Sequence, residues 1–154
     1  MELSSILKPE AVRVYAAVSS KKRLFQEIGD VAHACHGINA PDTVEALLER
    51  ESLGPTGVGH GVALPHARLP GLDSVVGVFV LLEKPLDFSA IDRQSVDIAF
   101  ALLAPEESGV EHLKALALVS RTLREPTLCA KLRANHDPSK LYALLTSPTS
   151  VKAA

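Results

Sequence analysis

SVVGVFVLLE, at residues 74–83, and VDIAFALLAP, at residues 96–105, are two strongly apolar segments near the middle of the chain. Each is about as long as one strand and is apolar over nearly all of that length. Strands with this composition are typical of sheets that helices bury on both faces. We therefore predict that the two segments form neighbouring parts of a largely buried sheet.

Helical patterns lie before these strands. Over residues 21–36 the apolar side chains recur at the spacing of one helical face. Gly37 is placed to end this helix. A capping-box pair, Asp42 and Glu45, predicts a second helix that continues to about residue 52.

Strands and helices alternate along the rest of the chain as well. Further strands are predicted at residues 11–18 and 62–67, and helical patterns return after the second apolar segment. Residues 147–154, SPTSVKAA, are expected to fray. This alternation predicts a three-layer α/β fold, with a largely buried sheet flanked by helices, and residues 1–154 are expected to form a single domain.

The composition excludes several classes of protein. A net charge of −2 over 154 residues gives no field that would attract nucleic acid or an anionic membrane surface. The longest apolar run, residues 75–82, is far shorter than the ~20 residues that span a bilayer, and the N-terminus does not resemble a signal peptide. Two cysteines are too few for a disulfide framework. We therefore expect a cytoplasmic protein with no nucleic-acid partner and no membrane insertion.

The segment GVGHGVALPHAR, at residues 57–68, carries the most informative histidine of the chain. His66 follows Pro65 and a glycine-rich bend, and Arg68 lies on the same side of an extended chain. A neutral imidazole offers a nucleophilic nitrogen, and cationic neighbours suit the carriage of a phosphoryl group. Position alone is equally compatible with a buried structural histidine. The bend and the proline favour the functional interpretation.

His112 is the second candidate. It lies in the first turn of a predicted helix that opens with the capping-box pair Ser108 and Glu111 and continues to about residue 124. Its position on the apolar face of this helix makes a structural role the simpler interpretation. A helix N-terminus favours anions, however, and a ring placed there can donate a hydrogen bond to a phosphoryl oxygen.

Arg50 and Thr56 are candidates for phosphate binding. Arg50 ends the helix that leads into the glycine-rich bend, and a guanidinium can hold two phosphoryl oxygens at once. Thr56 lies within the bend and could donate a hydroxyl. A solvated charge and a turn-stabilising threonine are the simpler alternatives for these two residues.

The sequence gives less support to other kinds of site. The glycine-rich bend follows a helix and leads into a strand, which is the reverse of a dinucleotide-binding fingerprint, and no GK[ST] motif occurs. His60, His66 and His112 could form a three-histidine zinc site. No HExxH motif occurs, however, and no Asp or Glu lies at a spacing from these histidines that is typical of a zinc site. An interaction module whose histidine is never modified is a further alternative.

Several segments carry a family resemblance that covers nearly the whole chain. They are SSILKPEAV, SSKKRLFQEIG, LLERESLGPTGVGHGVALPHARLPGL, GVFVLLEKPLDFSAIDRQSVDIAFALLAPEESG and EHLKALALVSRTLR. With these segments the chain resembles the enzyme IIA domains of the mannitol/fructose class in the bacterial phosphotransferase system. Within that class it is most similar to the nitrogen-related, stand-alone regulatory branch. The resemblance implies a mixed sheet flanked by helices.

The resemblance also implies roles for individual residues. His66 matches the phosphorylated histidine of the family, and His112 matches the second active-site histidine that supports the phosphoryl group. Arg50, within LLERE, matches the active-site arginine, and Thr56 matches a motif position. His60 is a departure, because many relatives carry asparagine there.

The function implied is that of a protein-histidine phosphotransferase that carries the group transiently and signals through its phosphorylation state. The implied donor is a histidine phosphocarrier protein of the NPr or HPr type, and no cofactor or metal is needed. Regulatory targets in the family include sensor kinases and potassium-transport components. The nearest rival is an IIA subunit of a mannitol- or fructose-type uptake system, and the absence of a linker after the last helix favours the regulatory branch. A zinc-dependent hydrolase is the rival from another class.

Overall fold

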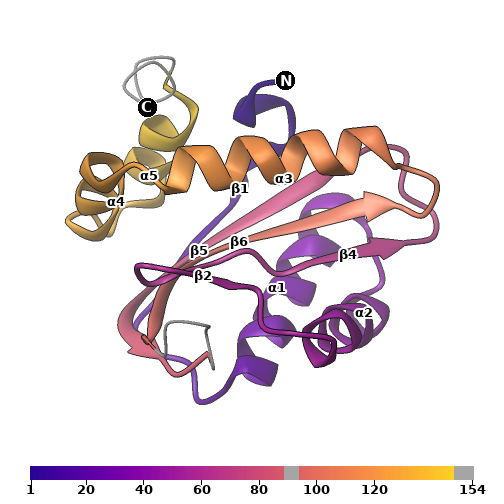
Figure 1. The fold of residues 1–154 in the computed structure, drawn as a ribbon, viewed down its shortest axis with the longest axis horizontal. Helices are drawn as coiled ribbons and strands as arrows, with labels where there is room; N and C mark the ends of the chain where they lie inside the picture. The colour runs from indigo at the N-terminus through magenta and orange to yellow at the C-terminus, as the bar shows by residue number, and fades with distance from the viewer. Residues whose placement is uncertain (89–93, 148–154) are drawn as a thin grey trace.

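A mixed sheet forms the centre of the fold in the computed structural model, which describes residues 1–88 and 94–147 (Figure 1). The strand order is β1-β5-β6-β3-β2, and β4 also pairs with β6. The strands of this sheet are β1 (Leu7–Tyr15), β2 (Gly57–Gly59), β3 (Val62–Ala63), β4 (His66–Leu69), β5 (Val76–Leu86) and β6 (Val96–Pro105).

The two apolar segments are the strands β5 and β6, as predicted, and they form the middle of the sheet. They pair with each other in antiparallel fashion, whereas β1 runs parallel to β5, and β3 and β4 run parallel to β6. Seven consecutive residues are buried in β5, and seven in β6. The prediction of a mixed, largely buried sheet is therefore confirmed.

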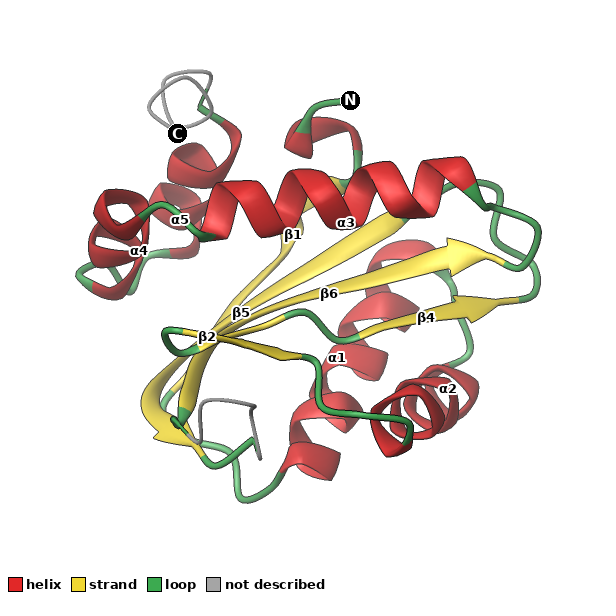
Figure 2. Ribbon diagram, viewed as in Figure 1, coloured by secondary structure: helices red, strands yellow, loops and turns green. Residues whose placement is uncertain are grey.

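Helices cover both faces of this sheet and give three layers (Figure 2). On one face lie α1 and α2, and on the other lies α3, with α4 and α5 at one end of the molecule. In the described part of the chain the helices are η1 (Leu3–Ser5), α1 (Lys21–His36), α2 (Ala40–Ser52), α3 (Val110–Leu123), α4 (Pro126–Arg133) and α5 (Pro138–Thr146).

The predicted caps of two helices are wrong, by three residues at α2 and by one residue at α3. The first residue of α2 is Ala40, because the side chain of Asn39 accepts a hydrogen bond from the backbone N–H of Asp42 and thereby caps the helix. Gly109 precedes α3 and makes no side-chain cap. Ser108 lies one residue earlier, in a turn that its N–H closes onto the carbonyl of Pro105, and its hydroxyl oxygen accepts no hydrogen bond from the described residues of the helix. The prediction for Gly37 is confirmed, since it ends α1 with a φ of 69°.

The predicted strand over residues 62–67 is interrupted in the structure. Residues 62–63 form β3, which makes a hairpin with β2, and the chain resumes as β4 at His66. Between them, the carbonyl of Pro65 accepts a hydrogen bond from Leu102 N–H, so the chain stays beside β6. His66 is thus the first residue of a strand, next to a rigid proline. The predicted strand over 11–18 is displaced to residues 7–15, and of the expected frayed end, residues 148–154 lie outside the described residues.

Candidate functional site

The ring of His66 is held in one tautomer by its two hydrogen-bond partners. Its Nδ1 lies 2.8 Å from the carbonyl oxygen of Leu64, two residues earlier. A carbonyl oxygen can only accept, so Nδ1 carries the hydrogen, and Nε2 is left with a lone pair. The Nε–H of Arg50 donates to this Nε2 over 3.3 Å. The structure therefore presents Nε2 as the nucleophilic atom of a neutral ring.

Burial of His66 lowers its pKa from the ordinary value of 6.5, and the positive charge of Arg50 lowers it further. The hydrogen bond to Leu64 and the charge of Glu51 act in the opposite direction and do not cancel this effect. The ring is accordingly neutral at pH 7. A neutral ring is what a nucleophilic histidine requires.

His112 lies beside His66, in the first turn of α3. The centroids of the two rings are 5.5 Å apart, and their planes make an angle of 71°. Burial lowers the pKa of His112, as do the neighbouring His66 and Arg68, so this ring is also neutral. Only 6% of the residue is exposed, and its Nε2 is buried without a hydrogen bond to any residue in the described part of the chain. The hydrogen-bonding capacity of this nitrogen is therefore unused among the described residues.

Two arginines bring positive charge to the same place. Arg50 lies in the last turn of α2, where its Nη1 donates to the carbonyl of Gly54 over 3.0 Å. Arg68 lies on β4, and its Nε approaches Nδ1 of His112 at 3.5 Å. Together with His66 and His112, these arginines line an open pocket of about 510 Å³. The sequence placed Arg68 on the same side of the chain as His66, and the structure adds it to the site.

Thr56 has a different environment. Its N–H and hydroxyl both donate to the carboxylate of Glu51, over 3.0 and 2.6 Å. Lys21 completes this cluster, with its Nζ 2.9 Å from Glu51 Oε2. Thr56 is buried and is not among the described residues that line the pocket around His66. Its role in binding phosphate stays a prediction, whereas its contact with Glu51 holds the bend next to Arg50.

Sequence reasoning missed Glu51. It follows Arg50 directly near the C-terminus of α2, where a solvated carboxylate would be the ordinary expectation. Its side chain is instead only 6% exposed. The one signal in the sequence that could have indicated a buried Glu51 was the presence of two possible partners, Lys21 and Thr56. They lie 30 and 5 residues from Glu51 in the chain, and neither had another assigned partner.

The three-histidine zinc site is not formed. His60 lies in the turn between β2 and β3 and lines a separate pocket with Cys129 and Arg133. Over residues 1–88 and 94–147, no group of three His, Cys, Asp or Glu side chains is placed to hold a metal ion. Within those same ranges, none of the helices has the length and apolar character that crossing a bilayer requires.

Comparison with known proteins gives consistent matches over nearly the full length. Residues 5–147 match the family described as "Phosphoenolpyruvate-dependent sugar phosphotransferase system, EIIA 2". The chain is 43% identical to a nitrogen regulatory protein of Bradyrhizobium diazoefficiens, over 99% of this chain and 100% of that one. It is 41% identical to a nitrogen regulatory protein of Escherichia coli strain K12, over 95% and 90% of the two chains.

A solved structure supports the same relationship. The crystal structure of nitrogen regulatory protein IIA-Ntr from Neisseria meningitidis superposes with a TM-score of 0.86, at 34% identity, over 93% of this chain and 98% of that one. These matches confirm the resemblance that was drawn from the sequence, including its nitrogen-related branch.

Proposed function

The chain belongs to the EIIA 2 family of the phosphoenolpyruvate-dependent sugar phosphotransferase system, and on this basis we propose that His66 accepts a phosphoryl group from the phosphohistidine of a small cytoplasmic carrier protein. One observation carries the proposal. The Nδ1–H of His66 is fixed on the carbonyl of Leu64, which aims the lone pair of Nε2 at the pocket that Arg50 also lines.

In the proposed transfer, Nε2 of His66 attacks phosphorus in line as the nitrogen–phosphorus bond of the donor breaks. The electron pair of that bond returns to the donor ring, so one nitrogen–phosphorus bond replaces another and the step is readily reversible. The transition state is loose, with charge spread over three equatorial oxygens, so catalysis depends on positioning and electrostatics. The neutral ring keeps its Nδ1–H on Leu64 throughout.

Arg50 has two roles in this scheme. Before transfer, its Nε–H donates a hydrogen bond to Nε2 of His66. This hydrogen bond holds the imidazole ring in place and engages the lone pair of Nε2. For the attack to occur, the guanidinium must leave Nε2 and turn to the phosphoryl oxygens, which it binds more strongly because they are charged. His112 is the second donor, since its Nε2 is unsatisfied and its ring is next to His66. Arg68 adds positive charge from the other side of His112.

The regulatory branch is the better assignment for the role of the phosphorylated form. The relatives at 41–43% identity are named nitrogen regulatory proteins. We therefore propose that the phosphorylation state of His66 is read by regulatory targets, with sensor kinases and potassium-transport components as candidates from the family. The alternative is an IIA subunit of a mannitol- or fructose-type uptake system, which would pass the group on to a sugar permease.

A transfer assay tests the proposal. The chain is incubated with radiolabelled phosphoenolpyruvate, enzyme I and the carrier, and we expect acid-labile, base-stable label on the wild type and none on His66→Ala. His136→Ala is the matched control, because this exposed histidine lies outside the pocket and should leave labelling intact. We expect Arg50→Gln to slow transfer on the order of 100-fold, as the loss of one preorganised donor does in enzymes. Label that persists in His66→Ala would refute the assignment.

A second arm separates the two branches. The phosphorylated chain is mixed with the IIB domains of mannitol- and fructose-type permeases. Retention of the label on His66 is expected for the regulatory role, whereas rapid transfer to a IIB domain would establish the uptake role instead.

A further inference from the structure

A second pocket lies away from His66, between the β2–β3 hairpin and the helices α3 and α4. We call it the hairpin pocket. Its volume is about 560 Å³, which is within the range of pockets that hold small molecules. The residues that line it and matter here are His60, Val62, Leu123, Arg124, Cys129 and Arg133. Nothing in the proposed transfer to His66 uses any of them.

The floor of the hairpin pocket is apolar. Val62, Leu123 and Cys129 are all buried. The thiol of Cys129 donates to the carbonyl of Leu123 over 3.1 Å, and burial raises its pKa, so it presents a neutral sulfur to the pocket. A ligand that covers this floor must therefore have an apolar body.

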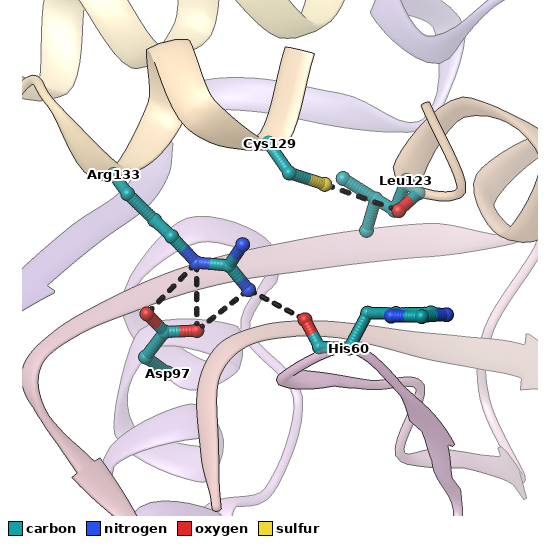
Figure 3. Close-up of polar contacts among 5 residues, drawn as sticks. All are labelled: His60, Asp97, Leu123, Cys129 and Arg133. Carbon is teal, nitrogen blue, oxygen red and sulfur yellow. Dashed lines mark hydrogen bonds and ion pairs between the residues drawn. The ribbon is translucent and has the colours of Figure 1, made fainter. Parts of the chain in front are cut away.

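The wall on the hairpin side is held by an ion pair, which Figure 3 shows. Arg133 donates from Nε and Nη2 to the carboxylate of Asp97, at 2.9 to 3.1 Å. The same Nη2 donates to the backbone carbonyl of His60 over 2.7 Å. The backbone of His60 has a φ of +57°, which is uncommon for a residue other than glycine. The hydrogen bond from Arg133 helps to hold the backbone in this conformation. The wall is thus fixed before any ligand arrives.

Positive charge lies at the rim of the hairpin pocket. The carboxylate of Asp97 neutralises the guanidinium of Arg133. The remaining nitrogen of that guanidinium, Nη1, is turned to the side where Cys129 and Leu123 lie (Figure 3). The exposed Arg124 adds a second guanidinium. The carboxylate of Glu125 caps α4 by accepting from Thr127 N–H and is not among the described residues that line the pocket. The pocket therefore combines an apolar floor with a cationic rim.

We propose that the hairpin pocket binds a small carboxylate with an apolar body, such as a medium-chain fatty acid. The apolar chain covers Val62, Leu123 and Cys129, and the carboxylate is held by Arg124 and by the free edge of Arg133. Guanidinium groups are suited to this because they bind a carboxylate through two parallel hydrogen bonds. A peptide or protein segment on the same surface is the competing occupant.

Titration of the full ¹⁵N-labelled chain with octanoate tests the proposal. We expect saturable shifts in the amide signals of the β2–β3 turn and of α4. Octanamide has the same apolar chain without the charge, and it should bind about tenfold more weakly, which corresponds to about 1.4 kcal/mol. The titration involves no phosphoryl transfer, so its outcome is independent of the function proposed for His66.

Three variants localise the binding. Arg124→Gln should weaken octanoate about tenfold and leave octanamide unchanged. Arg121→Gln is the matched control, because it removes the same charge three residues earlier, at an exposed position that does not line the pocket. This variant should bind octanoate like the wild type. Ala130→Phe fills the pocket from α4 and should abolish the binding of both probes.

The proposal is overturned if octanoate gives no saturable shift throughout the millimolar range, or if the shifts map to another surface. Equal binding of octanoate and octanamide would also overturn it, as would an equal loss in Arg124→Gln and Arg121→Gln. Binding of an apolar peptide in place of octanoate would assign the pocket to the competing occupant.

Discussion

At the scale of single residues, the account depends on how one imidazole is held. His66 is half-buried and neutral, its Nδ1–H is committed to Leu64, and its Nε2 faces a guanidinium. A structural histidine inside an apolar core would have no reason to accept a hydrogen bond from an arginine and to lie beside a second neutral imidazole. The geometry therefore favours the functional interpretation of His66, which its position in the sequence left open.

The pKa of His66 leads to a prediction for the pH dependence of transfer. Below this pKa the ring is protonated and Nε2 has no lone pair, so acceptance falls as the pH falls through it. Because burial lowers the pKa, the midpoint of this acid limb should lie below 6.5. The measurement is the initial rate of labelling against pH, with the carrier phosphorylated beforehand so that only the last transfer is followed. A midpoint above 6.5 would contradict the proposed electrostatics.

Thr56 provides a test between two roles. If it serves the bend, Thr56→Val removes a hydroxyl that donates to Glu51, which lowers the free energy of unfolding by about 1 kcal/mol. The labelling rate should then stay within about threefold of the wild type, since no donor to the phosphoryl group is lost. Chemical denaturation and the transfer assay measure the two quantities. Unchanged stability together with a rate loss on the order of 100-fold would instead support the phosphate contact.

At the scale of elements, the site is assembled from the ends of three of them. Arg50 comes from the last turn of α2, His66 from the start of β4, and His112 from the first turn of α3. The break at Leu64–Pro65 turns the chain so that β3 and β4 both pair with β6 while the carbonyl of Leu64 reaches the ring of His66. The hairpin that precedes this break is held by Arg133 and Asp97.

Two glycines with similar backbone angles test how tightly that hairpin is packed. Gly61 and Gly71 have φ values of 80° and 83°, so alanine is strained at either position. At Gly71 an added Cβ meets nothing within 4 Å, whereas at Gly61 it would lie 2.7 Å from Arg133 Nη2 and 2.9 Å from Asp97 Oδ1. We expect Gly71→Ala to cost about 1 kcal/mol and Gly61→Ala roughly 3 kcal/mol. If thermal denaturation gives the same loss of stability for both variants, the side chains of Arg133 and Asp97 can move aside at little cost, and the hairpin is not tightly packed.

The sequence predicted much of this architecture and part of the site. The central strands β5 and β6 follow from two long apolar runs, and α1 follows from a clear helical period that Gly37 ends. The cap of α2 was assigned to Asp42 because Asp42 and Glu45 have the spacing of a capping box, and only the backbone geometry selects Asn39 instead. Neither the buried Glu51 nor the hairpin pocket could be predicted, because both are formed by residues far apart in the chain.

At the scale of the whole molecule, the surface around His66 is suited to a protein donor. Leu53 lines the pocket and is 80% exposed, and Leu113, next to His112, is 66% exposed. Exposed apolar side chains that surround a small charged centre are typical of protein interfaces. This surface is separate from the hairpin pocket, whose lining residues are all different.

A charge placed on this surface should impair docking and leave the chemistry intact. We expect Leu113→Glu to lower the second-order rate constant for transfer about tenfold, while the rate at saturating carrier is unchanged. Ala34→Glu is the control, because it introduces the same charge at an exposed position on α1, on the other face of the sheet. Stopped-flow or quenched transfer at several carrier concentrations separates the two constants. Equal effects of the two substitutions would rule out docking at Leu113.

The position of the phosphoryl group on the imidazole is the most direct test of the whole scheme. The chain, ¹⁵N-labelled in histidine, is phosphorylated by the carrier, and its long-range ¹H–¹⁵N correlation spectrum is recorded. We expect phosphorylation on Nε2 of His66, with Nδ1 still protonated and bonded to Leu64. Phosphorylation on Nδ1, or on any other histidine, would contradict the arrangement from which the function is inferred.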